Sequence, residues 1–361
     1  MKKFRIFILL PSENSSGPVK GAFALANNLV TITNVCIIFI KKGNKINDYL
    51  DPKIKKIYLK GKSSNFIKKI INLRKFLRNF KQEELVTISF CFSADIINIF
   101  CKDLSYSISS VRGNLFKNYY FDYGIKGIIA AFFHILMLNF IDIVISMSNN
   151  MKNQIDKYLI NKTIIIPNFI DEKQIKPFFK PKIDQNNNIF KFIFIGNLSS
   201  RKQPLLLIKA IEKLHYKFSV FLDIIGDGEK IEELKKYVIK NKLDNIVIFH
   251  GHKENPFDLL SKADVFVLPS KSEGISRASL ESLFLGIPIV IRGVDSNYLL
   301  LEKSNSGSLF YNDEDLHSIM IKIANLSKSR EKRECLLPDK FRETNIKDIY
   351  KNVIFNLINY K

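Results

Sequence analysis

Tryptophan is absent from this 361-residue chain, histidine occurs five times and cysteine four times. The cysteines form no Cys-x-x-Cys pair and no histidine clusters with them; they are Cys36, Cys91, Cys101 and Cys335. This spacing argues against a zinc site and against a disulfide framework. Because Cys36 and Cys91 lie in apolar, strand-like runs, we expect both to be buried, reduced thiols of a cytosolic protein.

Long uninterrupted apolar runs are also missing. The nearest approach to a membrane span is residues 125–144, which include Lys126, His134, Asn139 and Asp142. We interpret this stretch as a core helix that runs into a strand. The apolar run at the N-terminus is short and contains Arg5, so we expect a first β-strand there and not a signal peptide.

Acidic residues are scarce relative to basic ones. The chain has 56 Lys and Arg against 35 Asp and Glu, a formal net charge of +21. Such an excess suits nucleic acid, anionic lipid or phosphate-bearing substrates. Because no recognisable nucleic-acid-binding module is present, we expect no nucleic-acid partner. The length and the 46% hydrophobic content are enough for two domains with sizeable cores.

Strand and helix patterns alternate along two stretches of the chain, which predicts an α/β fold with two Rossmann-like domains. The stretch Asp171–Asn188 contains Pro177, Pro181 and three consecutive asparagines, and it is predicted to link them. We expect one domain over residues 1–170, a second over 171–344, and a last helix at 345–361 that packs back on the first. The two sheets should face each other across a cleft, with ligands at the carboxyl ends of the strands.

The segment with the clearest chemistry contains Glu273 and Glu281. Val265–Leu268 is an apolar, β-branched run typical of a buried parallel strand, and turn residues follow it. Ser276 is a suitable N-cap for a helix that Gly286 ends. The helix N-terminus between the two glutamates offers free N–H groups and a positive dipole end to a phosphate. The two carboxylates can accept hydrogen bonds from sugar hydroxyls.

Two further segments of the second half fit a nucleotide site. Gly196 ends the apolar run Phe190–Ile195, and Arg201 and Lys202 follow just before a predicted helix. An Ile-Gly-Asp-Gly turn at 225–228 and a His-Gly-His sequence at 250–252 end the next two predicted strands. No third ligand accompanies the two histidines, so we expect no metal there.

In order and spacing these segments resemble the retaining glycosyltransferases of family 4, of the bacterial surface-polysaccharide type, which have the GT-B fold and an E-x7-E motif. The resemblance implies that Glu281 holds the donor's ribose, and that Glu273 contacts the sugar hydroxyls and orients the leaving diphosphate. Lys202 matches the lysine of the family's G-R-L-x-x-x-K sequence. Asn197 replaces the arginine, and we expect Arg201 to supply the missing charge.

The resemblance assigns catalysis to Glu273, Lys202 and Arg201. It assigns donor binding to Gly17, Gly196, Asn197, Gly226, His250, Gly251, Gly274, Ile275, Ser276 and Glu281. On the acceptor side it points to Lys20, in a loop where Ser16-Gly17 stands for the family's glycine pair, and to Arg112, where many members carry a histidine.

The implied donor is a nucleotide sugar, a UDP-sugar first and a GDP-sugar second, with no cofactor and no metal. The implied acceptor is a lipid-linked saccharide, which places the protein in the cytoplasm, peripherally on the inner face of the cytoplasmic membrane. Two alternatives stay open: a soluble acceptor, or a catalytically inactive protein that binds lipid or nucleic acid, because Asn197 departs from the family pattern.

A predicted basic amphipathic helix at Phe66–Gln82 also has two interpretations. Its apolar stripe consists of Phe66, Ile70, Leu73, Leu77 and Phe80, and its polar face carries six basic residues and no acid. The stripe either packs on the sheet or attaches to an anionic membrane surface.

Overall fold

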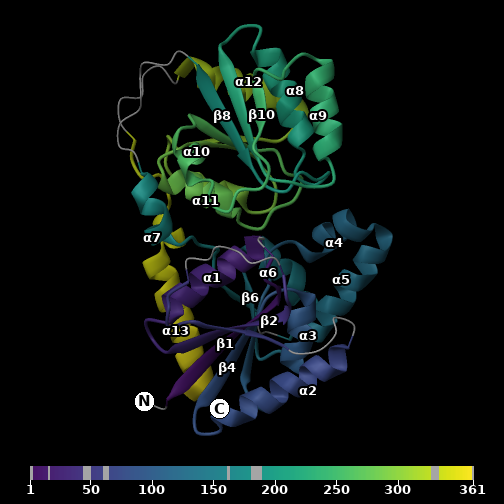
Figure 1. Cartoon of the computed structure of the whole chain (residues 1–361), viewed down its shortest axis with the longest axis vertical. Helices are drawn as coiled ribbons and strands as arrows, with labels where there is room; N and C mark the ends of the chain where they lie inside the picture. The colour runs from purple at the N-terminus through teal and green to yellow at the C-terminus, as the bar shows by residue number, and fades with distance from the viewer. Residues whose placement is uncertain are drawn as a thin grey trace. The chain divides into compact units, whose positions relative to one another are not determined.

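The computed structural model describes residues 3–14, 17–43, 50–59, 65–160, 163–179, 189–326 and 333–359. The chain divides into two compact units, one of residues 1–171 with 340–361 and the other of residues 172–339. Each unit is built on a parallel sheet with helices packed on it (Figure 1). This confirms the predicted α/β class with two Rossmann-like domains. Ser16 and part of the predicted linker, residues 180–188, lie outside the described residues.

The first unit has a parallel sheet in the order β3-β2-β1-β4-β5-β6-β7. Its strands are β1 (Phe4–Ser12), β2 (Asn34–Lys41), β3 (Lys55–Tyr58), β4 (Glu84–Ser89), β5 (Tyr106–Ser110), β6 (Ile143–Ser146) and β7 (Thr163–Ile165). The central strands are almost fully buried because helices cover both faces, which is why they read as continuous apolar runs. The strand order reverses between β1 and β4.

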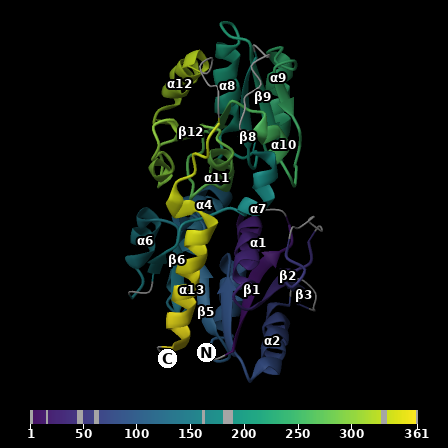
Figure 2. The same cartoon turned by 90° about the vertical axis from the view of Figure 1, so that its left-hand side faces the viewer.

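Seven longer helices accompany this sheet in the described part of the unit. They are α1 (Gly17–Leu29), α2 (Phe66–Leu77), α3 (Phe92–Ile99), α4 (Leu115–Tyr123), α5 (Ile125–Leu138), α6 (Asn149–Asp156) and α13 (Glu343–Asn359). Helices α1 and α13 lie side by side on one face of the sheet, in a core that includes Leu25, Phe39 and Ile354 (Figure 2). Helices α2 and α3 cover the other face, in a core that includes Phe7, Leu73 and Ile97.

The second unit has a parallel sheet in the order β10-β9-β8-β11-β12-β13. Its strands are β8 (Phe190–Ile195), β9 (Val220–Ile225), β10 (Val247–Phe249), β11 (Val265–Leu268), β12 (Ile289–Arg292) and β13 (Gly307–Phe310). Its helices are α7 (Glu172–Ile175), α8 (Pro204–Leu214), α9 (Ile231–Lys240), α10 (Phe257–Ser261), α11 (Arg277–Phe284) and α12 (Asp313–Leu326). Here the order reverses between β8 and β11.

The basic helix α2 packs on the sheet. Leu73 and Leu77 are buried in the core of the first unit, and Phe66, Ile70 and Phe80 pack against them. The stripe that was a candidate for membrane attachment is therefore covered by protein, because β1 and β2 offer it an apolar face. The helix ends at Leu77, where a 3₁₀ turn over Arg78–Phe80 takes over, and does not continue to Gln82.

Two other expectations are corrected in this unit. Cys36 is buried, and burial raises its pKa to about 12, but Cys91 is exposed. Strand β4 ends at Ser89, so Cys91 lies in the turn before α3, with a positive φ of 73°. Residues 125–138 form a helix that precedes a strand, as predicted, but only one face of that helix belongs to the core. None of the described helices is long and apolar enough to cross a membrane.

Candidate active site

The predicted catalytic residues lie at the carboxyl edge of the second unit's sheet. Arg201 and Lys202 follow β8, and Glu273 follows β11, so they lie on either side of the point where the strand order reverses. The loops after two such strands leave in opposite directions and open a crevice between them, where ligands of α/β proteins bind. The structure thus brings together three residues that are up to 72 positions apart in sequence.

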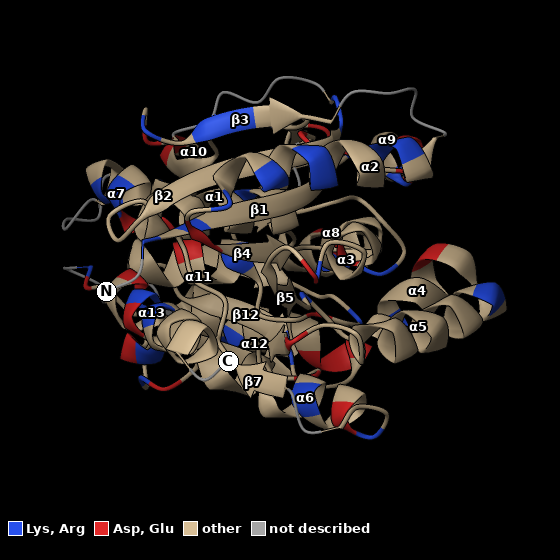
Figure 3. Cartoon of the chain, turned by 90° about the horizontal axis from the view of Figure 1, so that it is seen from below, with Lys and Arg blue, Asp and Glu red and all other residues tan. Residues whose placement is uncertain are grey.

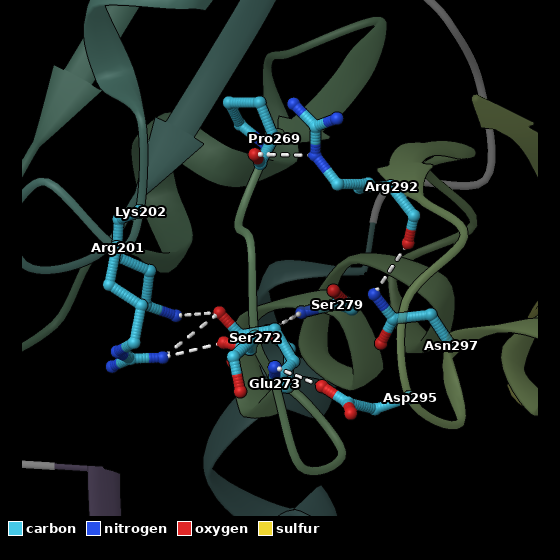
Figure 4. A network of polar contacts seen from close by, with 10 residues as sticks. Arg201, Lys202, Pro269, Ser272, Glu273, Ser279, Arg292, Asp295 and Asn297 are labelled. Atoms are coloured by element: carbon cyan, nitrogen blue, oxygen red, sulfur yellow. Dashed lines mark hydrogen bonds and ion pairs between the residues drawn. The ribbon is translucent and has the colours of Figure 1, made fainter. Parts of the chain in front are cut away.

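Two cations converge on one carboxylate in this crevice (Figure 4). The Lys202 ammonium donates a hydrogen bond to Oε1 of Glu273. The Arg201 guanidinium lies 3.6 Å from the same oxygen and donates to the Ser272 carbonyl at 2.7 Å. From the other side, the Glu273 amide donates to Oδ2 of Asp295 at 3.0 Å. Glu273 is therefore held in place through contacts of both its side chain and its backbone amide.

Burial strengthens the electrostatics of this cluster. Glu273 is 6% exposed. Burial alone would raise its pKa, but the charges of Lys202 and Arg201 outweigh that effect and hold the pKa of Glu273 below its usual value. Burial also lowers the pKa of Lys202, against the opposing effect of Glu273. A carboxylate that stays charged in such a place depends on its cations, because an unpaired buried charge is strongly unfavourable.

The helix α11 begins where the sequence predicts. Ser276 is its N-cap in an extended conformation, and its hydroxyl accepts a hydrogen bond from the Ser279 amide at 3.3 Å. The first turn of such a helix leaves several amides for a ligand. Gly274 and Ile275 stand directly before this cap, and both are buried. Glu281 is buried one turn further on, with Oε1 3.5 Å from Nη2 of Arg277.

The predicted donor-binding glycines join three neighbouring loops. The Gly196 amide donates to the Ile225 carbonyl at 3.0 Å, and the Gly226 amide donates to the Gly251 carbonyl at 2.9 Å. A Cβ on Gly226 would lie 1.8 Å from the Gly196 carbonyl oxygen, and the residue has a φ of +144°. Backbone packing therefore requires glycine at position 226, whether or not a ligand is bound.

Asn197 and His250 occupy the outer part of the same edge. The side-chain oxygen of Asn197 lies against Gly228, so closely that a Cβ on that glycine would be 2.2 Å from it. His250 follows β10, and its Nε2 lies 2.5 Å from Oδ1 of Asp223 on the adjacent strand. Within the described ranges no three His, Cys, Asp or Glu side chains gather as metal ligands.

Sequence reasoning missed Arg292 and Asp295. Arg292 ends β12 and is buried, and its guanidinium donates to the Pro269 carbonyl at 3.2 Å (Figure 4). It also donates to the Gln203 side-chain oxygen at 2.9 Å. It therefore connects the loops that carry Lys202 and Glu273. The only signal in the sequence is a basic residue at the end of the apolar run Ile289–Ile291, where a buried strand needs a partner for such a charge.

The first-unit residues gather at their own strand reversal. Gly17 begins α1, and Lys20 follows in its first turn. Arg112 follows β5, donates to Oδ1 of Asn168 at 3.0 Å and lies over the Phe90 ring at 4.6 Å. A Cβ on Gly21 would lie 3.7 Å from the Arg112 guanidinium, so this cation lies against the start of α1.

Comparisons with known proteins match parts of this chain to glycosyltransferases. Residues 176–337, nearly the whole second unit, match the family model "Glycosyl transferases group 1". The uncharacterized glycosyltransferase MJ1059 of Methanocaldococcus jannaschii is 29% identical over 62% of this chain and 59% of its own length. The O-antigen biosynthesis glycosyltransferase WclY of Escherichia coli is 26% identical over 81% of the chain and 84% of its own length.

A third relative is a UDP-Gal:α-D-GlcNAc-diphosphoundecaprenol α-1,3-galactosyltransferase of Escherichia coli, which is 33% identical over 43% of each chain. Among solved structures, Anabaena HepE in complex with UDP and glucose has a TM-score of 0.76 at 15% identity, over 98% of this chain and 100% of that one. A Thermosynechococcus elongatus sucrose-phosphate synthase has a TM-score of 0.80 at 14% identity, over 99% and 100%. The chain therefore has the two-domain fold of GT-B glycosyltransferases, and its second unit matches the group 1 glycosyl transferases.

Proposed function

We propose that the chain is a retaining glycosyltransferase of the family 4 type, which transfers a sugar from a nucleotide-sugar donor to a lipid-linked saccharide in surface polysaccharide biosynthesis. One observation carries the proposal: Lys202 and Arg201 converge on Glu273 at the strand reversal of the second unit, beside the N-terminus of α11. This is a site for a ligand that combines phosphate with hydroxyl groups.

The donor's diphosphate is the natural partner of the two cations. Lys202, Arg201 and the amides of residues 274–276 form its site, and Glu281 accepts from the ribose hydroxyls. When the diphosphate binds, it takes over contacts that Lys202 and Arg201 now make with Glu273. Glu273 then accepts hydrogen bonds from the sugar. A UDP-sugar is the first choice of donor, which agrees with the UDP bound to HepE.

Lys202 and Arg201 assist the cleavage of the bond between the sugar and the diphosphate. As the bond from the anomeric carbon to the diphosphate oxygen opens, negative charge builds up on the leaving diphosphate. Lys202 and Arg201 stabilise this charge in a buried place, where fixed charges act more strongly than in water. The acceptor hydroxyl adds to the same face of the sugar and passes its proton to the leaving diphosphate oxygen. The new bond forms on the face from which the diphosphate leaves, which keeps the anomeric configuration. These protein groups supply positive charge at the position where other glycosyltransferases use a metal, so we propose metal-independent transfer.

The acceptor and the place of action rest on the relatives. WclY acts in O-antigen biosynthesis, and the galactosyltransferase is named for a diphosphoundecaprenol acceptor. We extend this chemistry to the chain and propose that it works peripherally at the cytoplasmic face of the membrane. The paired state of Glu273 favours an active enzyme over an inactive scaffold, because a buried ion pair without a function is costly to keep.

Thermal unfolding with a panel of UDP-, GDP- and ADP-sugars tests the donor site. We expect one class to raise the melting temperature, since a ligand that binds only the native state stabilises it. Glu281→Ala should reduce that rise without lowering the ligand-free melting temperature by much. The matched control is Glu232→Ala, an exposed glutamate on α9. An unchanged response in Glu281→Ala would disprove the ribose assignment. The anomeric configuration of the product, read by NMR, tests retention.

A further inference from the structure

Helix α5 is apolar on both of its faces. Its inner face packs on the first unit through Gly127, Ala131, His134, Ile135 and Leu138, all of which are buried. The opposite side, here called the outer face, consists of Ile125, Ile128, Ile129, Phe132, Phe133 and Leu136. Their spacing of three and four residues makes one continuous stripe along the helix. The two faces together leave the helix almost without polar positions.

The outer face is exposed. Ile125 is 75% exposed, Ile129 56% and Phe133 59%, and Phe140, just beyond the helix, is 57% exposed. A surface helix normally turns charged residues to solvent, and a helix that is apolar all round belongs in a core or in lipid. Contiguous exposed apolar surface of this kind marks a binding surface. In the described part of the first unit the Phe132 ring packs on the Tyr158 ring at 5.5 Å, and the rest of the stripe is between 37% and 75% exposed.

The helix pair α4–α5 lies at the periphery of the first unit (Figure 1). Buried contacts on its inner side hold it so that the outer face of α5 is exposed. A Cβ on Gly127 would lie 1.9 Å from the Tyr119 carbonyl oxygen, so glycine lets the two helices approach closely. His134 is buried, with Nε2 2.8 Å from Oδ2 of Asp95 on α3 and Nδ1 2.9 Å from the Tyr119 hydroxyl. This network ties both helices to the body of the unit. The outer face is therefore a fixed feature.

The net charge of the first unit indicates whether a second copy of the chain or an anionic lipid surface covers the outer face. The first unit contains 30 Lys and Arg and 13 Asp and Glu, a net charge of +17, whereas the second contains 26 and 22, a net charge of +4. Helix α2 and strand β3 carry several of these basic residues (Figure 3). A second copy on the outer face would bring two strongly positive units together. An anionic lipid surface instead neutralises them.

We propose that the outer face of α5 docks on an anionic phospholipid bilayer. The 14-residue helix is about 21 Å long, too short to span a hydrocarbon layer of about 30 Å, so it lies in the interface. Phe132, Phe133 and the isoleucines enter the boundary between head groups and acyl chains, and Lys117 and Lys126 at the hairpin meet the lipid phosphates. The proposal deepens the proposed function and rests on it, because a lipid-linked acceptor is presented at a membrane.

Vesicle co-sedimentation tests the docking without sugar transfer. The purified chain should sediment with vesicles of phosphatidylglycerol and phosphatidylethanolamine, and much less with phosphatidylcholine alone. The double variant Ile129→Ser/Phe133→Ser should lower the vesicle partition coefficient about ten-fold or more, since two large apolar side chains leave the lipid. The matched control is Ile67→Ser/Ile71→Ser, which removes two exposed isoleucines from the basic helix α2 and should change partition less than about two-fold.

Several outcomes would overturn the proposal: no sedimentation of the wild type with anionic vesicles, equal partition of the α5 variant, or an equal loss in the α2 control. Sedimentation equilibrium without lipid tests the competing occupant, a second copy of the chain. A dimer that Ile129→Ser/Phe133→Ser dissociates would assign the outer face to a second copy. Ile125→Ser, at the exposed start of the helix, is a milder variant expected to lose about three-fold. The rise in melting temperature with nucleotide sugar should be the same in all variants, so failure of the docking is separable from failure of the donor site.

Discussion

The two units have the same architecture and use it differently. Each is a parallel sheet whose strand order reverses once, between β1 and β4 or between β8 and β11. The second unit is nearly neutral, at +4, and holds its functional charges in a buried cluster around Glu273. The first unit has a net charge of +17 and an uncovered apolar helix. We therefore propose that the paired charges of the second unit serve the reaction, and that the positive field of the first unit attracts a large, negatively charged partner.

The two strand reversals differ in the same way. At the second one, cations meet a buried carboxylate from an adjacent loop, which is an arrangement for stabilising charge during a reaction. At the first one, Arg112 lies on the Phe90 ring and against α1, with Asn168 as a neutral partner. A guanidinium held in that way can bind a hydroxyl or a phosphate. In the proposed mechanism Arg112 therefore positions the acceptor and takes no part in breaking the donor bond.

The largest effect should come from Lys202→Ala. It removes the ammonium that contacts Glu273 and, in the proposed mechanism, the leaving diphosphate. Loss of one preorganised electrostatic contact of this kind lowers kcat by about 10²–10³-fold. Steady-state kinetics with the donor found by thermal screening measure it. Lys240→Ala, on the exposed end of α9, is the control and should be neutral. Near-normal turnover in Lys202→Ala would remove catalysis from the second unit's cluster.

A stability effect should follow from Gly226→Ala. The new Cβ would meet the Gly196 carbonyl at 1.8 Å in a conformation with positive φ, so the loops after β8 and β9 must separate. We expect a loss of about 2–4 kcal/mol in the free energy of unfolding, confined to the second unit. Gly251→Ala is the matched control, because its φ is also positive but nothing lies within 4 Å of a Cβ. It should cost about 1 kcal/mol. Equal losses in urea titrations would contradict this account.

Much of the fold could be predicted because parallel strands are buried on both faces. Strands such as β1, β8 and β11 read as uninterrupted apolar runs, and the turn residues after them identify their ends. Strand β13 was missed because its sequence, Gly307–Phe310, is short and only partly buried at the sheet edge. Helix α4 was missed because most of its residues are partly or fully exposed and show no clear apolar period.

The site was predictable to the extent that it follows strand ends. Glu273 and Lys202 could be placed because each follows a strand of the same parallel sheet, and such ends share one edge. Asp295 and Arg292 could not be placed in the site from the sequence. Asp295 accepts a hydrogen bond from a backbone amide and Arg292 donates one to a backbone carbonyl, and the positions of both groups depend on tertiary packing. The sequence also could not predict which side of α5 is exposed, because the helix is apolar on both faces and either face could pack on the core.

A smaller effect is expected for Arg201→Ala. Arg201 contacts the Ser272 carbonyl and lies 3.6 Å from Glu273, so it supports the cluster at longer range than Lys202 does. A charge-assisted contact to phosphate is worth about 1.5–3 kcal/mol, and kcat/KM should fall about ten- to a hundred-fold.

A double-mutant cycle with Asn197→Arg shows whether Arg201 compensates for Asn197. Restoring the family's arginine should recover part of the loss, although Asn197 lies against Gly228 and the longer side chain must turn away from that loop. Strict additivity, with Arg201→Ala close to wild type, would show that Arg201 only supports the loop.

The smallest effect should be that of EDTA, which we expect to leave turnover unchanged. The argument is one of charge: Lys202, Arg201 and the first-turn amides of α11 already supply positive potential where the diphosphate would bind. The carboxylates nearest to them are engaged, because Glu273 pairs with the cations and Asp295 accepts from the Glu273 amide. Initial rates after chelation and dialysis, with Mg²⁺ or Mn²⁺ added back, measure the effect. If chelation abolished turnover and a divalent ion restored it, the protein's own cations would be insufficient. The second unit would then need a bound divalent ion for its chemistry, in addition to its own paired charges.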